Sequence, residues 1–162
     1  MMKRTSRSFL SAVLLAAAAY PLSGGDWSRF RGPNGTGVAE TSGLPTEFAP
    51  DRNVVWKTAL PMGKSSPALA ADRIFLTAHE NEKLYTVCLD RESGKILWRR
   101  AAPGRRLEKK HRLNDEASSS PVTDGENVYA FFGGYGLLSY GPDFSDDGVS
   151  LRRPHGRVPS VR

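Results

Sequence analysis

One stretch of the sequence occurs twice and decides the fold: SSPALAADRIFL at residues 65–76 and SSPVTDGENVYA at residues 119–130. Both copies hold Ser-Ser-Pro, a short apolar stretch, a turn led by aspartate and a strand-like end with an aromatic residue. The second copy begins 54 residues after the first, at position 119 against 65. Self-similarity at such a period indicates a repeat architecture, in which one unit cannot bury its apolar face alone.

Short strand-like segments surround the two copies, and turn residues separate them. β-Branched and aromatic residues favour strands at residues 54–58, 74–78, 85–89, 96–99, 127–132 and 137–140. A polar turn at residues 90–95 and a glycine-rich turn at 133–136 lie between them. No helical period extends beyond a turn, so the sequence predicts an all-β fold.

The order of strands and turns is that of an antiparallel propeller blade, which ends in a strand carrying tryptophan. Propellers arrange about 4–8 four-stranded blades around a channel, and such blades span about 40–50 residues. Trp56 and Trp98 lie 42 positions apart, close to this period. The longer offset of the repeat is explained by a charged insertion at residues 101–118, between the blades.

Four motifs resemble the PQQ-like β-propeller family, which is built from pyrroloquinoline-quinone-type repeats. They are LDRESGKILW at 89–98, Ser-Pro with a following Asp-x-Ile/Val-aromatic at 66–75 and again at 120–129, WSRFRGPNGTG at 27–37 and HRLNDEASSSP at 111–121. The last two resemble the exported bacterial members. The resemblance implies about two antiparallel four-stranded blades of a quinoprotein dehydrogenase-like propeller, present as an N-terminal fragment.

Several residues in these motifs have framework roles on physical grounds. Gly94 suits a turn that needs positive φ, and Trp98 is large enough to fill the gap between stacked sheets. Pro67 and Pro121 lack a backbone donor, which suits the start of an inner strand. Trp27 and Phe30 are expected to pin the turn-rich loop around them to an apolar surface.

The chain divides into four regions by composition. Residues 1–25 read as a secretory signal with a positive start and an apolar core of 12 residues at 9–20, which predicts a periplasmic or secreted protein. A membrane-spanning helix needs about 20 apolar residues, so we expect no stable membrane span, although an N-terminal anchor is the alternative. Residues 26–52 form a turn-rich lead-in, and residues 53–143 form the blades. The tail at 144–162 has no tryptophan and little apolar content, so it reads as out of frame, truncated or disordered.

The net charge of +6 gives no indication of a nucleic-acid partner once it is divided among these regions. The leader carries +3 and the tail +2, whereas residues 26–143 hold 16 basic and 15 acidic residues. A phosphate-binding surface needs clustered charge on one folded face. The dense basic run at 99–112 reads as a solvated loop. We expect a protein partner or self-association through open blade faces, and no nucleic acid.

No catalytic, cofactor-binding or metal-binding residue is predicted. His79, His111 and His155 lack metal-ligand spacing with one another or with Cys88. The neighbouring carboxylates Asp115–Glu116 and Asp146–Asp147 read as solvated loops, and Cys88 reads as a small buried strand residue. His111 and Asn114 receive no role beyond ordering their loop.

The expected function is therefore a non-enzymatic binding or scaffold module in the cell envelope, without a cofactor. The resemblance also implies an alternative, a fragment of a PQQ-dependent alcohol dehydrogenase-like oxidoreductase, which would need PQQ and Ca²⁺ held by oxygen ligands. Quinone and calcium binding would separate these two hypotheses. A second alternative is a truncated product without independent function.

Overall fold

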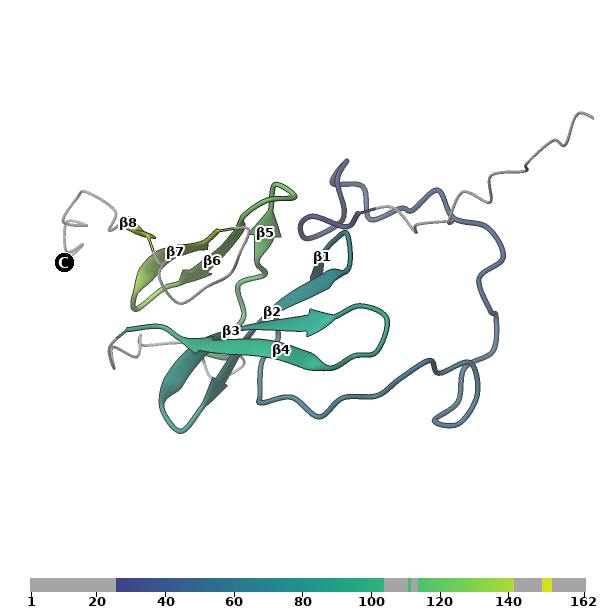
Figure 1. Ribbon diagram of the computed structural model, residues 1–162, viewed down its shortest axis with the longest axis horizontal. Helices are drawn as coiled ribbons and strands as arrows, with labels where there is room; N and C mark the ends of the chain where they lie inside the picture. The colour runs from purple at the N-terminus through teal and green to yellow at the C-terminus, as the bar shows by residue number, and fades with distance from the viewer. Residues whose placement is uncertain (1–25, 104–110, 112–113, 142–149, 153–162) are drawn as a thin grey trace, which may run out of the picture.

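The computed structural model describes residues 26–103, 111, 114–141 and 150–152, and this part of the chain is all-β, as predicted. No helix that could cross a membrane occurs among these residues. Two four-stranded antiparallel sheets follow one another along the chain (Figure 1). Sheet 1 has the order β1–β2–β3–β4 and consists of Ala68–Ala70, Arg73–Glu80, Lys83–Asp90 and Ile96–Ala101. Sheet 2 has the order β5–β6–β7–β8 and consists of Val122–Thr123, Val128–Phe132, Gly136–Tyr140 and Ser150–Arg152.

Local turn chemistry closes the hairpins of sheet 1. Asn81 and Glu82 connect β2 to β3 with φ angles of 49° and 60°, as a two-residue turn with positive φ at both positions requires. Between β3 and β4, Gly94 has φ 70° and donates its N–H to the carbonyl of Asp90 at 2.9 Å. The predicted positive φ of Gly94 is therefore confirmed. The carboxylate of Asp90 also accepts the N–H and hydroxyl of Ser93, at 2.8 and 2.6 Å.

Within each copy of the Ser-Ser-Pro stretch, the first two strands pair with one another, and the register is the same in both copies. Ala68 lies opposite Phe75 in sheet 1, and Val122 lies opposite Tyr129 in sheet 2. In each copy the proline stands directly before the first strand, as expected for Pro67 and Pro121. Each residue of β5 and β6 thus has a counterpart in β1 and β2 that lies 54 positions earlier.

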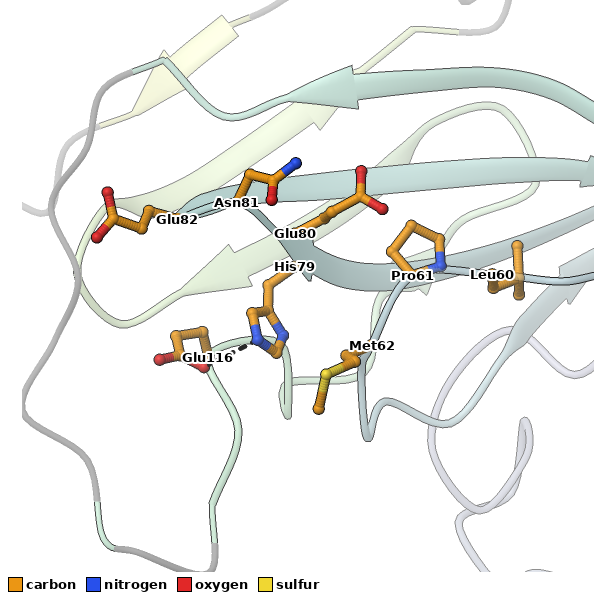
Figure 2. Close-up of a pocket in the computed structure, with 8 residues that line it drawn as sticks. All are labelled: Leu60, Pro61, Met62, His79, Glu80, Asn81, Glu82 and Glu116. Carbon is orange, nitrogen blue, oxygen red and sulfur yellow. Dashed lines mark ion pairs between the residues drawn. The ribbon is translucent and has the colours of Figure 1, made fainter.

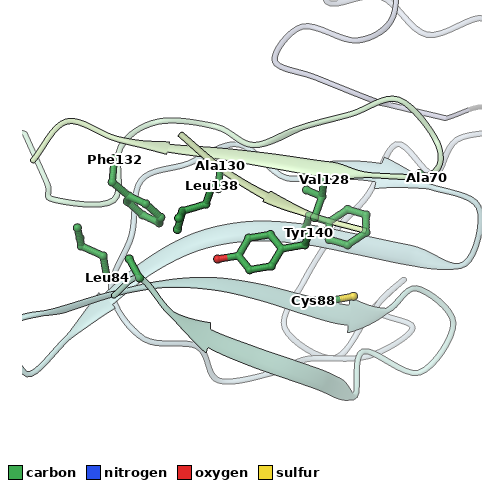
Figure 3. Packing of buried hydrophobic residues seen from close by; sticks show 10 residues of the cluster. Ala70, Leu84, Cys88, Val128, Ala130, Phe132, Leu138 and Tyr140 are labelled. Atoms are coloured by element: carbon green, nitrogen blue, oxygen red, sulfur yellow. The ribbon is translucent and has the colours of Figure 1, made fainter. Parts of the chain in front are cut away.

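The sheets stack front to back, so that opposite faces meet at the core. From β2 the core takes Phe75, whose counterpart in sheet 2 is Tyr129. From β6 it takes Val128, whose counterpart in sheet 1 is Ile74. Since neighbouring residues of a strand point to opposite faces, the front of sheet 1 packs on the back of sheet 2. The core also contains Ala70, Leu84, Cys88, Ala102, Ala130, Phe132, Leu138 and Tyr140 (Figure 3).

Trp98 of β4 packs between the sheets, as its size predicts. Its ring centroid lies 6.2 Å from that of Phe75 in sheet 1 and 5.4 Å from that of Tyr140 in sheet 2, and both pairs are tilted. Tilted aromatic pairs at these separations add to the stabilisation that area burial provides. The guanidinium of Arg100 lies 5.0 Å from the Trp98 ring, so this member of the predicted basic loop contributes to the sheet contact.

The predicted strand at residues 54–58 is wrong, because this segment has no strand partner in the described chain. Val54 and Val55 are exposed, and Trp56 anchors the segment by donating its indole N–H to the carbonyl of Arg91 at 3.0 Å. Thr58 donates its hydroxyl to the carbonyl of Gly94 at 2.6 Å. A strand-like composition alone does not make a strand, which also needs a neighbour to supply backbone hydrogen bonds.

The lead-in at residues 26–52 is joined to sheet 1 through the backbone of Trp27, whereas the predicted apolar contact of the Trp27 side chain stays a prediction. Trp27 exchanges both backbone hydrogen bonds with Leu69 of β1, at 3.1 and 2.9 Å. The prediction for Phe30 is wrong, since its ring is exposed. Gly32 has φ 77° and packs so closely under the Trp27 ring that an added Cβ would lie 2.8 Å from it.

Strand β8 lies within the tail at 144–162, for which the sequence predicts a disordered or out-of-frame segment. At residues 150–152 the chain instead pairs with β7, with Leu138 opposite Leu151. Backbone pairing along a free strand edge needs no apolar pattern, so composition could not predict it. The rest of the tail, including Asp146–Asp147 and His155, lies outside the described residues.

Candidate functional site

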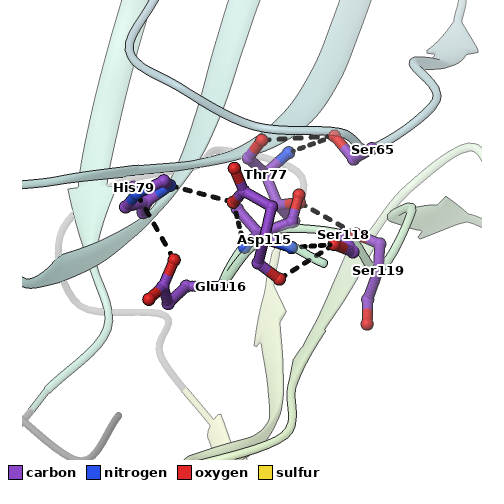
Figure 4. A network of polar contacts seen from close by, with 8 residues as sticks. Ser65, Thr77, His79, Asp115, Glu116, Ser118 and Ser119 are labelled. Carbon is purple, nitrogen blue, oxygen red and sulfur yellow. Dashed lines mark hydrogen bonds and ion pairs between the residues drawn. The ribbon is translucent and has the colours of Figure 1, made fainter. Parts of the chain in front are cut away.

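Three segments meet beside β2, where the chain passes from one sheet to the other. Thr77 of β2 donates its hydroxyl to the carbonyl of Ser119 at 2.8 Å and to that of Ala117 at 3.3 Å. On its other side, the Thr77 N–H donates to the hydroxyl of Ser65 at 3.0 Å (Figure 4). The connecting loop at residues 114–120 is therefore attached to sheet 1 before it enters β5.

The loop fixes the position of its own acidic residue. Asp115 accepts the N–H of Ala117 on Oδ1 at 2.8 Å, and its carbonyl accepts the hydroxyl of Ser118 at 2.8 Å. Ala117 is fully buried, so the loop cannot turn outward without exposing it. These contacts direct the carboxylate of Asp115 toward β2 rather than into solvent.

His79, near the end of β2, lies between two carboxylates of this loop. Its Nδ1 is 2.9 Å from Oδ1 of Asp115, and its Nε2 is 3.4 Å from Oε2 of Glu116. The side chains of His79, Asp115 and Glu116 are only 20%, 5% and 15% exposed. One ligand atom from each lies within 4.8 Å of the others. The prediction that Asp115–Glu116 is a solvated pair is wrong, because backbone contacts hold the loop against the sheet.

A cavity of about 570 Å³ opens beside this cluster (Figure 2). His79 and Glu116 form part of its wall, and the rest comes from the β2–β3 hairpin and from the segment that approaches β2. That segment pairs with the strand through Met62, whose carbonyl accepts the His79 N–H at 2.7 Å. The other lining residues are Leu60, Pro61, Glu80, Asn81 and Glu82.

A second candidate surface is the outer face of sheet 2, opposite the core. Val122, Phe131 and Leu137 project there and are 43%, 46% and 38% exposed. Phe131 and Leu137 lie directly opposite one another on β6 and β7. Apolar side chains gathered on one sheet face make it a candidate contact surface.

The counterparts of these three residues in sheet 1 are covered. Val122 corresponds to Ala68, and the pair Phe131–Leu137 corresponds to the pair Thr77–Thr86. Ala68, Thr77 and Thr86 are 0%, 2% and 0% exposed, because sheet 2 and the connecting loop pack on that face. The same side of the second sheet therefore lacks the cover that the first sheet has.

The residues that the sequence left without a site role are placed as follows. Cys88 lies fully buried in β3, as predicted, and burial raises the pKa of its thiol to about 12. Burial likewise raises the pKa of the Tyr140 hydroxyl. Asn114 donates its N–H to the carbonyl of His111 at 2.9 Å, so both residues stand at the start of the loop. Neither joins the cluster around His79.

Hydrogen bonds in two turns lower the pKa of aspartate carboxyls. The hydroxyl and N–H of Ser93 donate to Asp90 and lower the pKa of its carboxyl. At Asp124, the N–H of Asn127 and the hydroxyl of Tyr129 hold the carboxyl pKa well below its ordinary value. Arg99 forms an ion pair with Glu80 at 2.5 Å and stacks 3.8 Å over the Tyr85 ring.

Sequence reasoning missed the cluster of His79, Asp115 and Glu116. His79 stands 36 positions before Asp115 (115 against 79), so no local spacing joins them. The signal that could have found it is the short distance in sequence between Asp115–Glu116 and Ser119–Ser120–Pro121, which places two carboxylates just before the second copy. No family model, curated protein or solved structure matches the chain.

Proposed function

We propose that this chain is an exported PQQ-like β-propeller repeat module that binds protein in the cell envelope and catalyses no reaction. The observation that carries the proposal is that one face of sheet 1 is buried, whereas the equivalent face of sheet 2 is exposed. Ala68, Thr77 and Thr86 of sheet 1 are buried, whereas Val122, Phe131 and Leu137 of sheet 2 are exposed. The occupant that fits the outer face of sheet 2 is a further antiparallel sheet.

Three features support a sheet as the occupant. The two sheets of the chain already stack front to back, and each has four strands in sequential order. The shared register of Ala68–Phe75 and Val122–Tyr129 extends the correspondence to individual residues. Stacked sheets lie about 10 Å apart, and their side chains interdigitate in the space between them. The exposed side chains of Phe131 and Leu137 are large enough to fill such a space.

In the purified protein the occupant is a second copy of the chain, since it is the only source of a sheet. We therefore expect the wild-type chain to self-associate, with a sedimentation coefficient that rises with protein concentration. The double variant Phe131→Lys, Leu137→Lys places two charges on this face, where burying them without partners is costly. We expect it to sediment as a monomer.

Phe48→Lys is the matched control, because Phe48 is also exposed but belongs to the lead-in. It is expected to associate as the wild type does. A monodisperse wild-type monomer over roughly 1–100 μM, which spans ordinary affinities for protein contacts, would overturn the proposal. Association of the double variant at wild-type strength would do the same.

A further inference from the structure

We propose that His79, Glu116 and Asp115 form a binding site for a divalent transition-metal ion of the zinc type. Imidazole nitrogen and carboxylate oxygen are ligands that Zn²⁺ accepts in proteins. A mixed set of this kind favours Zn²⁺ and its neighbours over Mg²⁺ or Ca²⁺, which prefer oxygen alone. The inference goes beyond the proposed protein binding and concerns a different part of the molecule.

The distances locate the ion between His79 and Glu116. Two atoms that bind one tetrahedral zinc ion at about 2.0–2.2 Å are separated by about 3.3–3.6 Å. Nε2 of His79 and Oε2 of Glu116 are 3.4 Å apart, a separation longer than the common hydrogen-bond distance of about 2.9 Å. Both residues line the cavity, so water or a ligand can occupy the remaining coordination positions.

Asp115 lies behind the imidazole ring. Its Oδ1 is 2.9 Å from Nδ1, on the opposite side from the nitrogen that contacts Glu116. A carboxylate in this place accepts the second ring hydrogen, fixes the tautomer and raises the basicity of the ligating nitrogen. Asp115 is therefore a positioning residue, and the N–H of Ala117 holds its carboxylate in place.

The surroundings of Nδ1, the ring nitrogen that faces Asp115, also bear on the site. This atom is inaccessible to solvent and makes no aligned hydrogen bond within the described chain, although Asp115 lies at hydrogen-bond distance. Leaving a buried polar atom without a hydrogen bond is costly. A small rotation of the ring on binding an ion at Nε2 would align Nδ1–H with the carboxylate of Asp115 and remove that cost.

The cluster also joins parts of the chain that are distant in sequence. His79 belongs to sheet 1, whereas Glu116 and Asp115 belong to the loop that leads into sheet 2. A ligand that binds only the folded chain stabilises it by mass action. An ion at this site is thus expected to stabilise the docked loop as well as to bind.

The experiment titrates Zn²⁺ into the purified full chain by calorimetry and records the visible absorption of the Co²⁺ form as evidence of nitrogen and oxygen coordination. The wild type is expected to bind one equivalent. His79→Ala is expected to abolish binding, and Glu116→Gln to weaken it by at least about 10-fold. Asp115→Asn is expected to weaken it by about 10–100-fold, the range for a residue that orients a ligand.

Two matched controls are His111→Ala and Glu82→Gln. His111 lies on the same connection and Glu82 lines the cavity, but neither belongs to the cluster of His79, Asp115 and Glu116. Both are expected to bind as the wild type. Circular dichroism of each metal-free variant checks the fold, and Glu116→Gln keeps the side-chain shape if His79→Ala does not fold. Absence of wild-type binding, or wild-type affinity in Glu116→Gln, would overturn the proposal.

Discussion

The backbone N–H of Ser66 donates a hydrogen bond of 2.9 Å to the hydroxyl of Ser120, which stands 54 positions later in the chain. The two residues occupy the same place in the two copies of the Ser-Ser-Pro stretch. The inner strands β1 and β5 that follow them also lie in contact. The two copies of the duplicated sequence are thus in direct contact. The hydroxyl of the second copy accepts a hydrogen bond from the backbone of the first.

Ser120→Ala removes this acceptor and leaves the Ser66 N–H without it. We expect a loss of about 1–3 kcal/mol in the free energy of unfolding, the range for a donor left unsatisfied. Ser139→Ala, on the outer face of sheet 2, is the control and is expected to change stability by less than about 0.5 kcal/mol. Urea unfolding followed by circular dichroism measures both, and equal losses in the two variants would contradict the assignment.

Trp98→Ala opens a gap between the sheets, because the ring contacts Phe75 on one side and Tyr140 on the other. Such truncations cost about 3–5 kcal/mol, so the variant is expected to unfold at a much lower urea concentration. Trp98→Phe retains part of the contact and is expected to lose less. Tryptophan fluorescence and circular dichroism measured together show whether the sheets separate before their strands unfold.

A Trp98→Ala variant with wild-type stability would show that the aromatic contact is not needed for stacking. Trp27→Ala is the control for loss of an indole from the lead-in. It is expected to cost less, because the two bonds of Trp27 to Leu69 are made by the backbone, which alanine retains, whereas the Trp98 ring packs on aromatic rings of both sheets.

Most of the fold could be predicted from local patterns, because alternation and turn residues act over a few positions. Strands β2, β3, β4, β6 and β7 lie where composition placed them, and Gly94 has the expected φ. Residues 54–58 show the limit, since they have strand composition but no neighbouring strand in the described chain. Strand β8 shows the opposite case, a strand made by an available edge rather than by its own pattern.

The candidate metal site could not be predicted in the same way. His79 and Glu116 meet because contacts such as those of Thr77 attach the connecting loop to β2. These contacts depend on how the two sheets stack, and the stacking cannot be predicted from the spacing of residues within a short segment. Two adjacent carboxylates in a polar stretch are usually solvated, so the composition favoured the wrong interpretation. Burial of Ala117 beside them was the missing information.

Gly94→Ala tests whether the β3–β4 turn needs glycine for its backbone and for its contact with Trp56. The φ of 70° is disfavoured for alanine by about 1–2 kcal/mol, and an added Cβ would lie 2.3 Å from the Trp56 ring. Gly125→Ala separates the two effects, because Gly125 has φ 98° but nothing within 4 Å of an added Cβ. We expect Gly94→Ala to lose more stability than Gly125→Ala in urea unfolding.

Equal losses in the two glycine variants would mean that the Trp56 contact contributes nothing and that only backbone strain matters. A further variant, Gly94→Ala combined with Trp56→Ala, removes the clash. It is expected to lose less than the sum of the two single losses, since residues in contact are not additive.

Asp124 is expected to make the stability of the chain depend on acid pH. The N–H of Asn127 donates to its carboxylate at 2.6 Å and the hydroxyl of Tyr129 at 2.7 Å, and these bonds lower its pKa in the folded state. A carboxyl with a lowered folded pKa stabilises the fold above its unfolded value of 3.8. That contribution is lost as the pH falls from there through the folded pKa.

Asp124→Asn removes the titrating group, and Tyr129→Phe removes one of its donors. We expect both variants to show a weaker decline in the free energy of unfolding below about pH 4 than the wild type, with Asp124→Asn the flatter of the two. Asp51→Asn, in the exposed lead-in, serves as the control and is expected to keep the wild-type slope. Thermal unfolding at a series of pH values gives the measurement. A wild-type slope in Asp124→Asn would show that other carboxyls determine acid unfolding.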